Sequence, residues 1–315
     1  MKIAIIGIGG IGGYISSKLC STDHAHKSVT HNTEIILIQR GKHGEKIKEN
    51  GLTYEGKTTE IYYPDAVYKS IHKAGILDYI IVCTKSKDLE QTVSEFSNHL
   101  HEKSCIITLL NGVNNAERIQ KILPRHRVLQ GCIYVSASIK KPGIVQQIGG
   151  AGKVFIGPEN DNITETDNTI YSIFNDAGIP TVLTEDITTE VWKKYLFICT
   201  FATITSRYNK PIGKIVRNEK YVTETKQLLT EIISVAHSQD ISITKKDKDN
   251  VIKLAYKIPE NTPTSMQLDV HSGKKPEIDI LTKYIIDQAE KNNIDVPLHK
   301  KMYTDIQNII EKNHG

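Results

Sequence analysis

The chain has 315 residues, of which 39% are hydrophobic and 24% are charged, and its formal net charge is +4. This length allows two domains, because a single hydrophobic core usually stops growing at roughly 250 to 300 residues. The 40 Lys and Arg residues are scattered along the chain, so no nucleic-acid-binding surface is indicated, and no run of about 18 apolar residues predicts a membrane span.

The five cysteines are odd in number, lack CxxC spacing and mostly lie in apolar segments. This usage is typical of free, buried thiols in a reducing compartment. The N-terminal segment is apolar, but five glycines interrupt it and no A-x-A-like cleavage site follows. We therefore expect a cytoplasmic protein.

The first predicted strand is Lys2–Ile6, and a glycine-rich turn leads directly into a helix over Tyr14–Cys20. In such a turn Gly7 permits the tight bend, Gly9 lets the backbone approach a pyrophosphate, and Gly12 allows close helix packing. Backbone N–H groups at the helix N-terminus would then face the phosphates. We predict a dinucleotide site whose cofactor contacts are Gly7, Ile8, Gly9, Gly10, Ile11 and Gly12.

The segment Ser21–Asn32 carries three histidines. Neither a cysteine nor a carboxylate stands at a spacing suited to a metal site. We expect an exposed insertion loop and no bound metal.

The second predicted strand, Glu34–Ile38, is followed by Gln39 and Arg40. An acidic residue at the end of this strand binds the ribose 2′-hydroxyl of NAD, whereas an arginine nearby suits the 2′-phosphate of NADP. Glu34 lies at the wrong end of the strand for the first role. The pattern therefore favours NADPH, with Arg40 as the phosphate contact and Lys42 as a second candidate.

Two further buried strands, Leu77–Thr84 and Ser104–Leu110, are followed by Lys85 and Asn111. Open α/β sheets bind ligands at the carboxyl ends of their strands. Lys85 and Asn111 are therefore candidate cofactor or substrate contacts, and the alternative is that each merely caps a loop.

The remaining elements before residue 186 complete an α/β domain. We expect a hairpin over Leu52–Tyr63, antiparallel edge strands at Val128–Ser138 and Lys153–Gly157, a helix over Glu165–Asn175 and a last strand at Pro180–Leu183. Residues 1–185 are thus predicted to form a Rossmann-type doubly wound sheet.

Residues 186–315 show helical periodicity, which predicts an all-α second domain able to support a homodimer. Its first helix, which Asp186 can cap, places Lys193 and Lys194 before an apolar run. These lysines are either solvated or held near a ligand. Ser265 and Glu277 stand at predicted helix starts, where each could simply be a cap. The apolar repeats lie in Tyr221–Ala236, Val251–Ile258, Ile278–Ala289 and Met302–Ile310.

These motifs, in this order along nearly the whole chain, resemble the ketopantoate reductase family. The residues that carry the resemblance are Gly7-x-Gly9-x-x-Gly12, Lys85, Asn111-Gly112, Trp192-x-Lys194, Ser265-Met266-x-x-Asp269, Glu277-Ile278-Asp279 and Ile294-Asp295-Val296-Pro297.

The resemblance implies a cleft between the two domains in which NADPH reduces a 2-oxo acid to a 2-hydroxy acid. The first substrate candidate is 2-dehydropantoate (ketopantoate), reduced to (R)-pantoate in pantothenate and coenzyme A biosynthesis. By position, Lys194 is the catalytic lysine and also contacts substrate. Glu277 is its acidic partner and a cofactor contact, Ser265 binds the substrate carboxylate, and Asn111 and Lys85 contribute from the first domain.

The sequence departs from the family pattern where asparagines are expected for the polar substrate. Those positions hold Ile198, Ala202, Ile212 and Thr262. Because lost hydrogen-bonding groups change specificity strongly, a reductase of a bulkier or less polar 2-oxo acid is an alternative. A related dehydrogenase acting on a 3-hydroxy acid or an imine, and a non-catalytic NADPH-binding sensor, are further alternatives.

Overall fold

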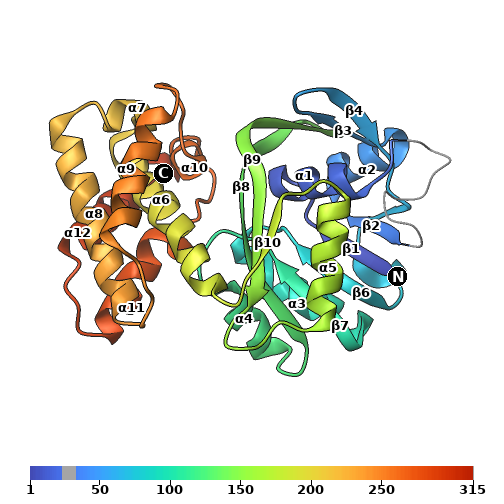
Figure 1. The fold of residues 1–315 in the computed structure, drawn as a ribbon. Coiled ribbons are helices and arrows are strands. Elements are labelled where there is room, and N and C mark those ends of the chain that lie inside the picture. The colour runs from blue at the N-terminus through green and yellow to red at the C-terminus, as the bar shows by residue number, and fades with distance from the viewer. Residues whose placement is uncertain (23–32, 315) are drawn as a thin grey trace. The chain divides into compact units, whose positions relative to one another are not determined.

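A computed structural model describes residues 1–22 and 33–314 (Figure 1). It divides into two compact units, Met1–Ile187 and Thr188–Gly315. Most of the histidine-rich segment predicted to be an insertion loop, Ser21–Asn32, lies outside the described residues.

The first unit is built on six parallel strands in the order β5-β2-β1-β6-β7-β8. This is the strand order of the dinucleotide-binding Rossmann fold, so the predicted fold class is confirmed. The strands are β1 (Lys2–Ile6), β2 (Glu34–Ile38), β5 (Ala66–Tyr68), β6 (Leu77–Val82), β7 (Leu100–Thr108) and β8 (Arg127–Lys141).

Both faces of this sheet are covered, because its central strands are apolar on both sides. In β1, Ile3 and Ile5 enter one core, while Ala4 and Ile6 enter the other. Figure 1 shows helices beside both faces. The first core holds side chains of α1 (Gly10–Leu19), α2 (Gly41–Asn50) and α5 (Glu165–Asp176), and the second holds those of α3 (Leu89–Phe96) and α4 (Asn115–Ile122).

The sheet continues beyond β8, so the prediction that the strands following β7 form an edge is wrong. Strand β9 (Ile144–Pro158) pairs antiparallel with β8, and β3 (Leu52–Glu55) pairs parallel with β9. The predicted hairpin is confirmed, because β4 (Thr59–Tyr62) pairs antiparallel with β3. Strand β10 (Thr181–Leu183) also pairs with β9. Strand periodicity cannot reveal such long-range pairing, since it reports only which face of a strand is buried.

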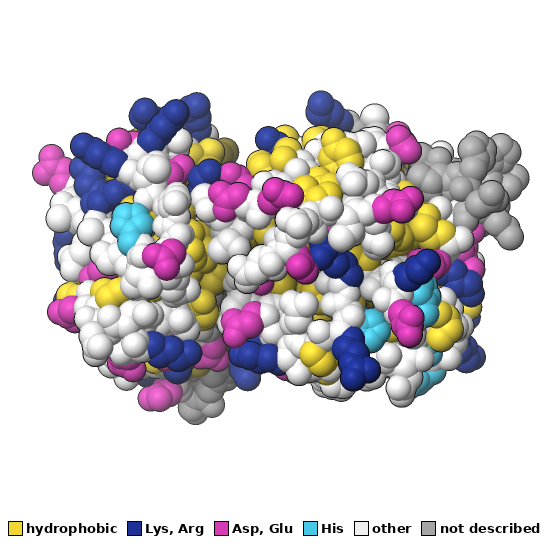
Figure 2. All heavy atoms as spheres, turned by 60° about the horizontal axis from the view of Figure 1, so that its bottom comes forward, with side chains coloured by type: hydrophobic (Ala, Val, Ile, Leu, Met, Phe, Trp, Pro, Cys, Tyr) yellow, Lys and Arg dark blue, Asp and Glu magenta, His cyan; other side chains and the backbone are white. Residues whose placement is uncertain are grey.

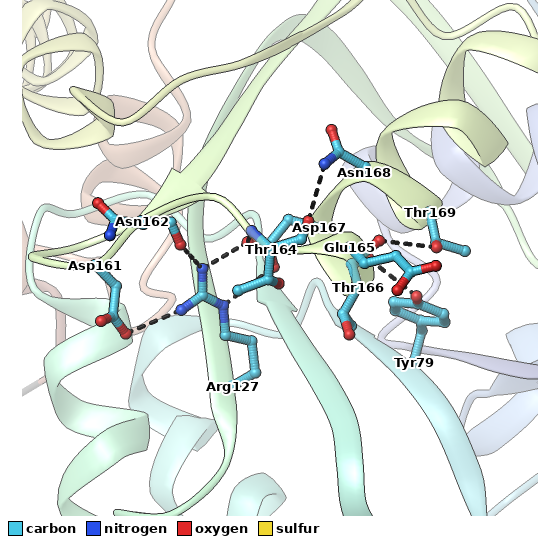
Figure 3. A network of polar contacts seen from close by, with 10 residues as sticks. All are labelled: Tyr79, Arg127, Asp161, Asn162, Thr164, Glu165, Thr166, Asp167, Asn168 and Thr169. Carbon is cyan, nitrogen blue, oxygen red and sulfur yellow. Dashed lines mark hydrogen bonds and ion pairs between the residues drawn. The ribbon is translucent and has the colours of Figure 1, made fainter.

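Arg127 of β8 ties the loop between β9 and α5 to the sheet (Figure 3). Its guanidinium donates to the fully buried carboxylate of Asp167 (Nε to Oδ1, 3.1 Å), to Asp161 (2.9 Å) and to the carbonyl of Asn162 (2.7 Å). Asp167 also accepts from the N–H of Thr164, the N-cap of α5, at 2.8 Å. One buried carboxylate therefore anchors both the arginine and the start of a helix.

The second unit is helical in its described part, as predicted. Ser265 is the first residue of α10, and a π-helical turn at Asp279–Lys283 precedes α11. The helices are α6 (Ile187–Tyr208), α7 (Ile212–Ile215), α8 (Glu219–His237), α9 (Lys245–Lys257), α10 (Ser265–His271), α11 (Tyr284–Lys291) and α12 (Pro297–His314). Over the residues described, none of the helices in either unit has both the length and the apolar character needed to cross a bilayer.

Charged side chains of both signs are mixed over the surface that Figure 2 shows. This distribution follows from the scattered lysines and from ion pairs within a helix or between neighbouring elements, such as Lys121 with Glu117 and Lys69 with Glu45. Such exposed pairs contribute little to stability.

A buried contact between Glu231 and His299 fixes the start of α12. The carboxylate of Glu231, on α8, accepts from the N–H groups of Leu298 and His299 at 3.0 Å each and from the His299 ring at 2.7 Å. Burial alone would raise the pKa of Glu231, but the hydrogen bonds and the charge of His299 outweigh it and lower that pKa. The last helix is thus capped by a carboxylate from another helix.

We expect Asp167→Ala to lower the free energy of unfolding by roughly 2–4 kcal/mol, because it leaves a partly buried guanidinium and a helix start without their main partner. Urea unfolding followed by circular dichroism measures this loss. The control is Asp161→Ala, which removes a carboxylate that is 66% exposed from the same arginine and should cost less than about 1 kcal/mol. Equal losses in the two variants would contradict the assignment.

The lowered pKa of Glu231 predicts a pH-dependent contribution to stability. A carboxylate whose pKa is lowered by folding stabilises the protein when the pH is above the carboxylate's ordinary pKa of 4.5. This stabilisation is lost as the pH falls through the lower pKa of the folded state. Unfolding monitored by Trp192 fluorescence should therefore show a smaller acid dependence below pH 4.5 in Glu231→Gln than in the wild type. The exposed Glu311→Gln on α12 is the control, and an identical acid profile in both variants would refute the prediction.

Candidate functional site

The glycine turn after β1 leaves no room for side chains at two of its three motif positions. Gly7 has φ +89°, and a Cβ there would lie 2.9 Å from the Cys83 carbonyl oxygen. A Cβ at Gly12 would lie 2.1 Å from the Gly7 carbonyl oxygen, whereas one at Gly9 would meet nothing within 4 Å. Gly9 therefore exposes backbone to open space at the start of α1, as an approaching diphosphate requires.

The other two glycines of this segment serve packing that the sequence motif does not reveal. A Cβ at Gly10 would lie 1.9 Å from the Ala137 carbonyl oxygen of β8, and one at Gly13 would lie 2.7 Å from the Val145 side chain of β9. Gly10, predicted as a cofactor contact, thus also lets α1 press against the β8–β9 hairpin.

Gln39, which the sequence reasoning left without a role, connects β2 to the glycine turn. Its side-chain oxygen accepts from the Ile8 N–H at 2.6 Å, and its amide nitrogen donates to the Arg40 carbonyl at 3.1 Å. The signal that could have identified it is its position directly after β2, where the fold places the ribose-reading residue.

A cavity of about 350 Å³ opens beside the glycine turn. Its lining brings together four predicted contacts, Gly7, Gly9, Arg40 and Lys85, from the ends of β1, β2 and β6. Glu95 of α3 also lines it. Exposed backbone at a helix start and two cationic side chains suit a dinucleotide with its phosphates, so the residues present fit a nicotinamide dinucleotide.

Arg40 is not isolated in this cavity. Its guanidinium Nη2 lies 2.7 Å from both carboxylate oxygens of Glu95, and Gln91 donates to that carboxylate at 3.0 Å. The Arg40 side chain is 66% exposed and that of Glu95 is 32% exposed. Sequence reasoning missed Glu95 because 55 residues separate it from Arg40.

Asn111 lies at the turn after β7, outside the lining of this cavity. The buried Asn115 holds its backbone, since its amide donates to the carbonyls of Leu110 (3.3 Å), Asn111 (3.1 Å) and Gly112 (3.3 Å). The turn that carries Asn111 is therefore held by a side chain of α4.

The turn of Lys85 is tied to the same helix by Arg118. The guanidinium of Arg118 donates to the Ser86 carbonyl and to Glu90, at 2.7 Å each. Lys85 occupies the N-cap position of the short turn Ser86–Asp88 but makes no side-chain capping hydrogen bond there. The two interpretations of Lys85, a ligand contact and a loop cap, both stay predictions.

In the second unit, Lys194 lies in the N-terminal half of α6. The adjacent Tyr195 hydroxyl donates to the Leu281 carbonyl at 2.6 Å, and the Thr203 and Thr282 hydroxyls lie 2.7 Å apart. Helix α6 therefore packs against the π-helical turn that begins two residues after Glu277. Lys194 lies on α6, and Glu277 precedes the adjoining π-helical turn by two residues.

The π-helical turn itself was not predicted, although a helix over Ile278–Ala289 was. Its signature is the Lys283 N–H donating to the Ile278 carbonyl, five residues earlier, at 3.0 Å. Such turns are frequent at functional sites. Periodicity cannot separate this turn from an ordinary helix start, because one wider turn barely changes the apolar pattern.

Ser265 is not the cap of its helix. That role belongs to Thr264, whose hydroxyl accepts from the Gln267 N–H at 3.2 Å and lies 2.7 Å from the Thr205 hydroxyl. Thr205 follows Lys194 by eleven residues, about three helical turns, so both lie on one face of α6. Ser265 thus adjoins the far end of the face that starts at Lys194.

The residues between these two ends are apolar. Ala202 is 4% exposed, and Ile198 is half-buried. The two other positions that depart from the family pattern also lie together, since the Ile212 N–H donates to the Thr262 carbonyl at 3.0 Å. Lys193, the other lysine before the apolar run, forms an ion pair with Glu190 at 2.7 Å, and its side chain is 35% exposed.

Within residues 1–22 and 33–314, no group of three His, Cys, Asp or Glu side chains is arranged to hold a metal ion. The absence of a metal in the proposed chemistry stays a prediction.

Two family models match the chain. The model described as ketopantoate reductase PanE/ApbA matches residues 3–161, and its C-terminal counterpart matches residues 186–309. An uncharacterized oxidoreductase, YkpB of Bacillus subtilis, is 23% identical over 98% of both chains.

Solved structures agree with this match. The 2-dehydropantoate 2-reductase of Porphyromonas gingivalis is 27% identical with a TM-score of 0.84, covering 98% of this chain and 99% of that one. A D-mandelate dehydrogenase in a ternary structure with NADH and anilino(oxo)acetate shares the fold, with 20% identity, a TM-score of 0.87 and full coverage of both chains. With its Rossmann-type first unit, glycine turn and helical second unit, the chain belongs to the ketopantoate reductase family of oxidoreductases, which act on small molecules with a nicotinamide dinucleotide.

Proposed function

We propose that this protein reduces a 2-oxo acid to a 2-hydroxy acid with NADPH, and that Lys194 acts on the carbonyl oxygen. The observation that carries the proposal is the placement of Lys194 at one end of an α6 face whose other end adjoins Ser265. A cation on α6 and a hydroxyl at the start of the adjoining α10 are the two kinds of group that a 2-oxo acid needs, one for its ketone oxygen and one for its carboxylate.

The bound cofactor supplies hydride to the carbonyl carbon. As negative charge grows on the carbonyl oxygen, the Lys194 ammonium stabilises it and then donates a proton to it. Glu277 holds that ammonium in place and contacts the cofactor, while Ser265 donates its hydroxyl to the substrate carboxylate. Asn111 and Lys85 contribute from the first unit, where α4 fixes the turns that carry them.

NADPH is preferred over NADH in this proposal because Arg40 lines the nucleotide cavity after β2. A guanidinium at this position binds the 2′-phosphate, and Lys42 is a second candidate contact. Location in the cytoplasm and assembly as a homodimer remain parts of the proposal.

The family points to 2-dehydropantoate as the first substrate to test, with (R)-pantoate, a precursor of pantothenate, as the product. Ile198 and Ala202 favour a second candidate, a bulkier or less polar 2-oxo acid, because they offer no hydrogen bond to a hydroxylated substrate. The D-mandelate dehydrogenase of the same fold makes an aryl 2-oxo acid a sensible member of the substrate panel.

The function is tested by following NADPH oxidation with 2-dehydropantoate, branched 2-oxo acids and an aryl 2-oxo acid. Turnover of at least one of them is expected. If NADPH binds and none of these acids is reduced, the reductase proposal fails and the non-catalytic sensor is favoured. Turnover only with 3-oxo acids or imines would favour the related dehydrogenase.

Lys194→Ala should lower kcat by about 10²–10⁴-fold, the usual contribution of a positioned proton donor, while NADPH affinity changes little. Stopped-flow hydride transfer and fluorescence titration measure the two quantities. The matched control is the adjacent Lys193→Ala, which should keep near-normal kcat. A Lys194→Ala variant with wild-type kcat would remove this lysine from its role.

Arg40→Ala should raise the KM for NADPH by roughly tenfold, since a charge-assisted phosphate contact contributes about 1.5–3 kcal/mol before the discount for exposure. The KM for NADH should stay within about twofold, because NADH lacks the 2′-phosphate. Steady-state assays with both cofactors provide the comparison, and an unchanged KM for NADPH would reject Arg40 as the phosphate contact.

A further inference from the structure

The Arg40–Glu95 pair lines the proposed nucleotide cavity at its solvent-exposed side. Both residues line the cavity beside the glycine turn, and Arg40 Nη2 lies 2.7 Å from each oxygen of the Glu95 carboxylate. The proposed ligand of Arg40 is itself an anion. Glu95 therefore already occupies part of the guanidinium that a 2′-phosphate would use.

The Glu95 carboxylate is held in this orientation from its own helix. Gln91, one turn earlier on α3, also lines the cavity and donates to Glu95 Oε1 at 3.0 Å. The backbone of Arg40 is held as well, because its carbonyl accepts a hydrogen bond from the side-chain nitrogen of Gln39. The side-chain oxygen of Gln39 in turn accepts from the Ile8 N–H in the glycine turn. The pair thus joins a fixed carboxylate to a fixed backbone.

We propose that Glu95 sets the cofactor preference by competing with the 2′-phosphate of NADPH for Arg40. Binding of NADPH then requires the Arg40 guanidinium to release the Glu95 carboxylate and bind the 2′-phosphate, or to bind both anions while they repel each other. NADH makes no such demand, because its ribose carries a neutral 2′-hydroxyl. Glu95 accordingly narrows the preference for NADPH over NADH that Arg40 alone would give.

This inference rests on the proposed role of Arg40 in NADPH binding but not on the identity of the 2-oxo acid. It is therefore tested by equilibrium binding of the two reduced cofactors to the full chain, without any substrate. If none of the carbonyl compounds is reduced, the proposed function is refuted, but the binding measurement remains valid.

We expect Glu95→Gln, which keeps the shape of the side chain and removes its charge, to tighten NADPH binding by roughly five- to tenfold at low salt. NADH binding should change by less than about twofold. The gain for NADPH should shrink in 1 M salt, where the screening length falls to about 3 Å. An unchanged or weakened NADPH affinity relative to NADH would overturn the proposal.

Two further variants separate competition from other effects. Glu49→Gln removes the same charge from an exposed ion pair with Lys46 on α2, and should leave both affinities unchanged. In an Arg40→Ala background, Glu95→Gln should no longer improve NADPH binding, because no guanidinium is left to release. A full gain in that background would show that Glu95 acts on the cofactor without Arg40 and would refute competition.

Discussion

The close approach of α1 to its surroundings is the constraint on which the first unit depends. A Cβ at Gly12 would lie 2.1 Å from the Gly7 carbonyl oxygen, and one at Gly10 would lie 1.9 Å from that of Ala137. Helix α1 can therefore occupy this position only with glycine at two places: Gly12, which faces the turn after β1, and Gly10, which faces β8. That fixed start explains why the glycines form a run and not only the three positions of the dinucleotide motif.

Helix α3 supplies an acidic partner to each of two arginines. Glu90 pairs with Arg118, the residue that ties the Lys85 turn to α4, while Glu95 pairs with Arg40. The first pair is structural, because Arg118 also donates to the Ser86 backbone. The second involves a largely exposed arginine, so it can open at small cost. In the proposed competition, this difference lets Glu95 modulate NADPH binding without disturbing the fold.

Helix α6 separates two tasks in the second unit. Tyr195, Cys199 and Thr203 hold it to the π-helical turn, whereas the neighbouring face runs from Lys194 over Ile198 and Ala202. In the proposed function, substitutions on the second face alter which substrate is accepted without loosening the first. In the proposed reaction, Lys194 keeps its role while the groups beside it change from polar to apolar. The contacts of Tyr195, Cys199 and Thr203 with the π-helical turn hold α6, and therefore Lys194, in position.

The amino-acid sequence by itself determined the strands and the glycine turn of the first unit, the helical second unit and the family, because these depend on local periodicity and on motifs within short segments. It also singled out Arg40 and Lys85, which one cavity brings together with Gly7 and Gly9. Tertiary structure alone decided that β8 and β9 lie inside the sheet, that Thr264 and not Ser265 caps α10, and that Glu95 meets Arg40 across 55 residues. Each of these rests on contacts between segments distant in the chain, and neither the period of a strand nor the composition of a helix specifies which distant partner a polar side chain will meet.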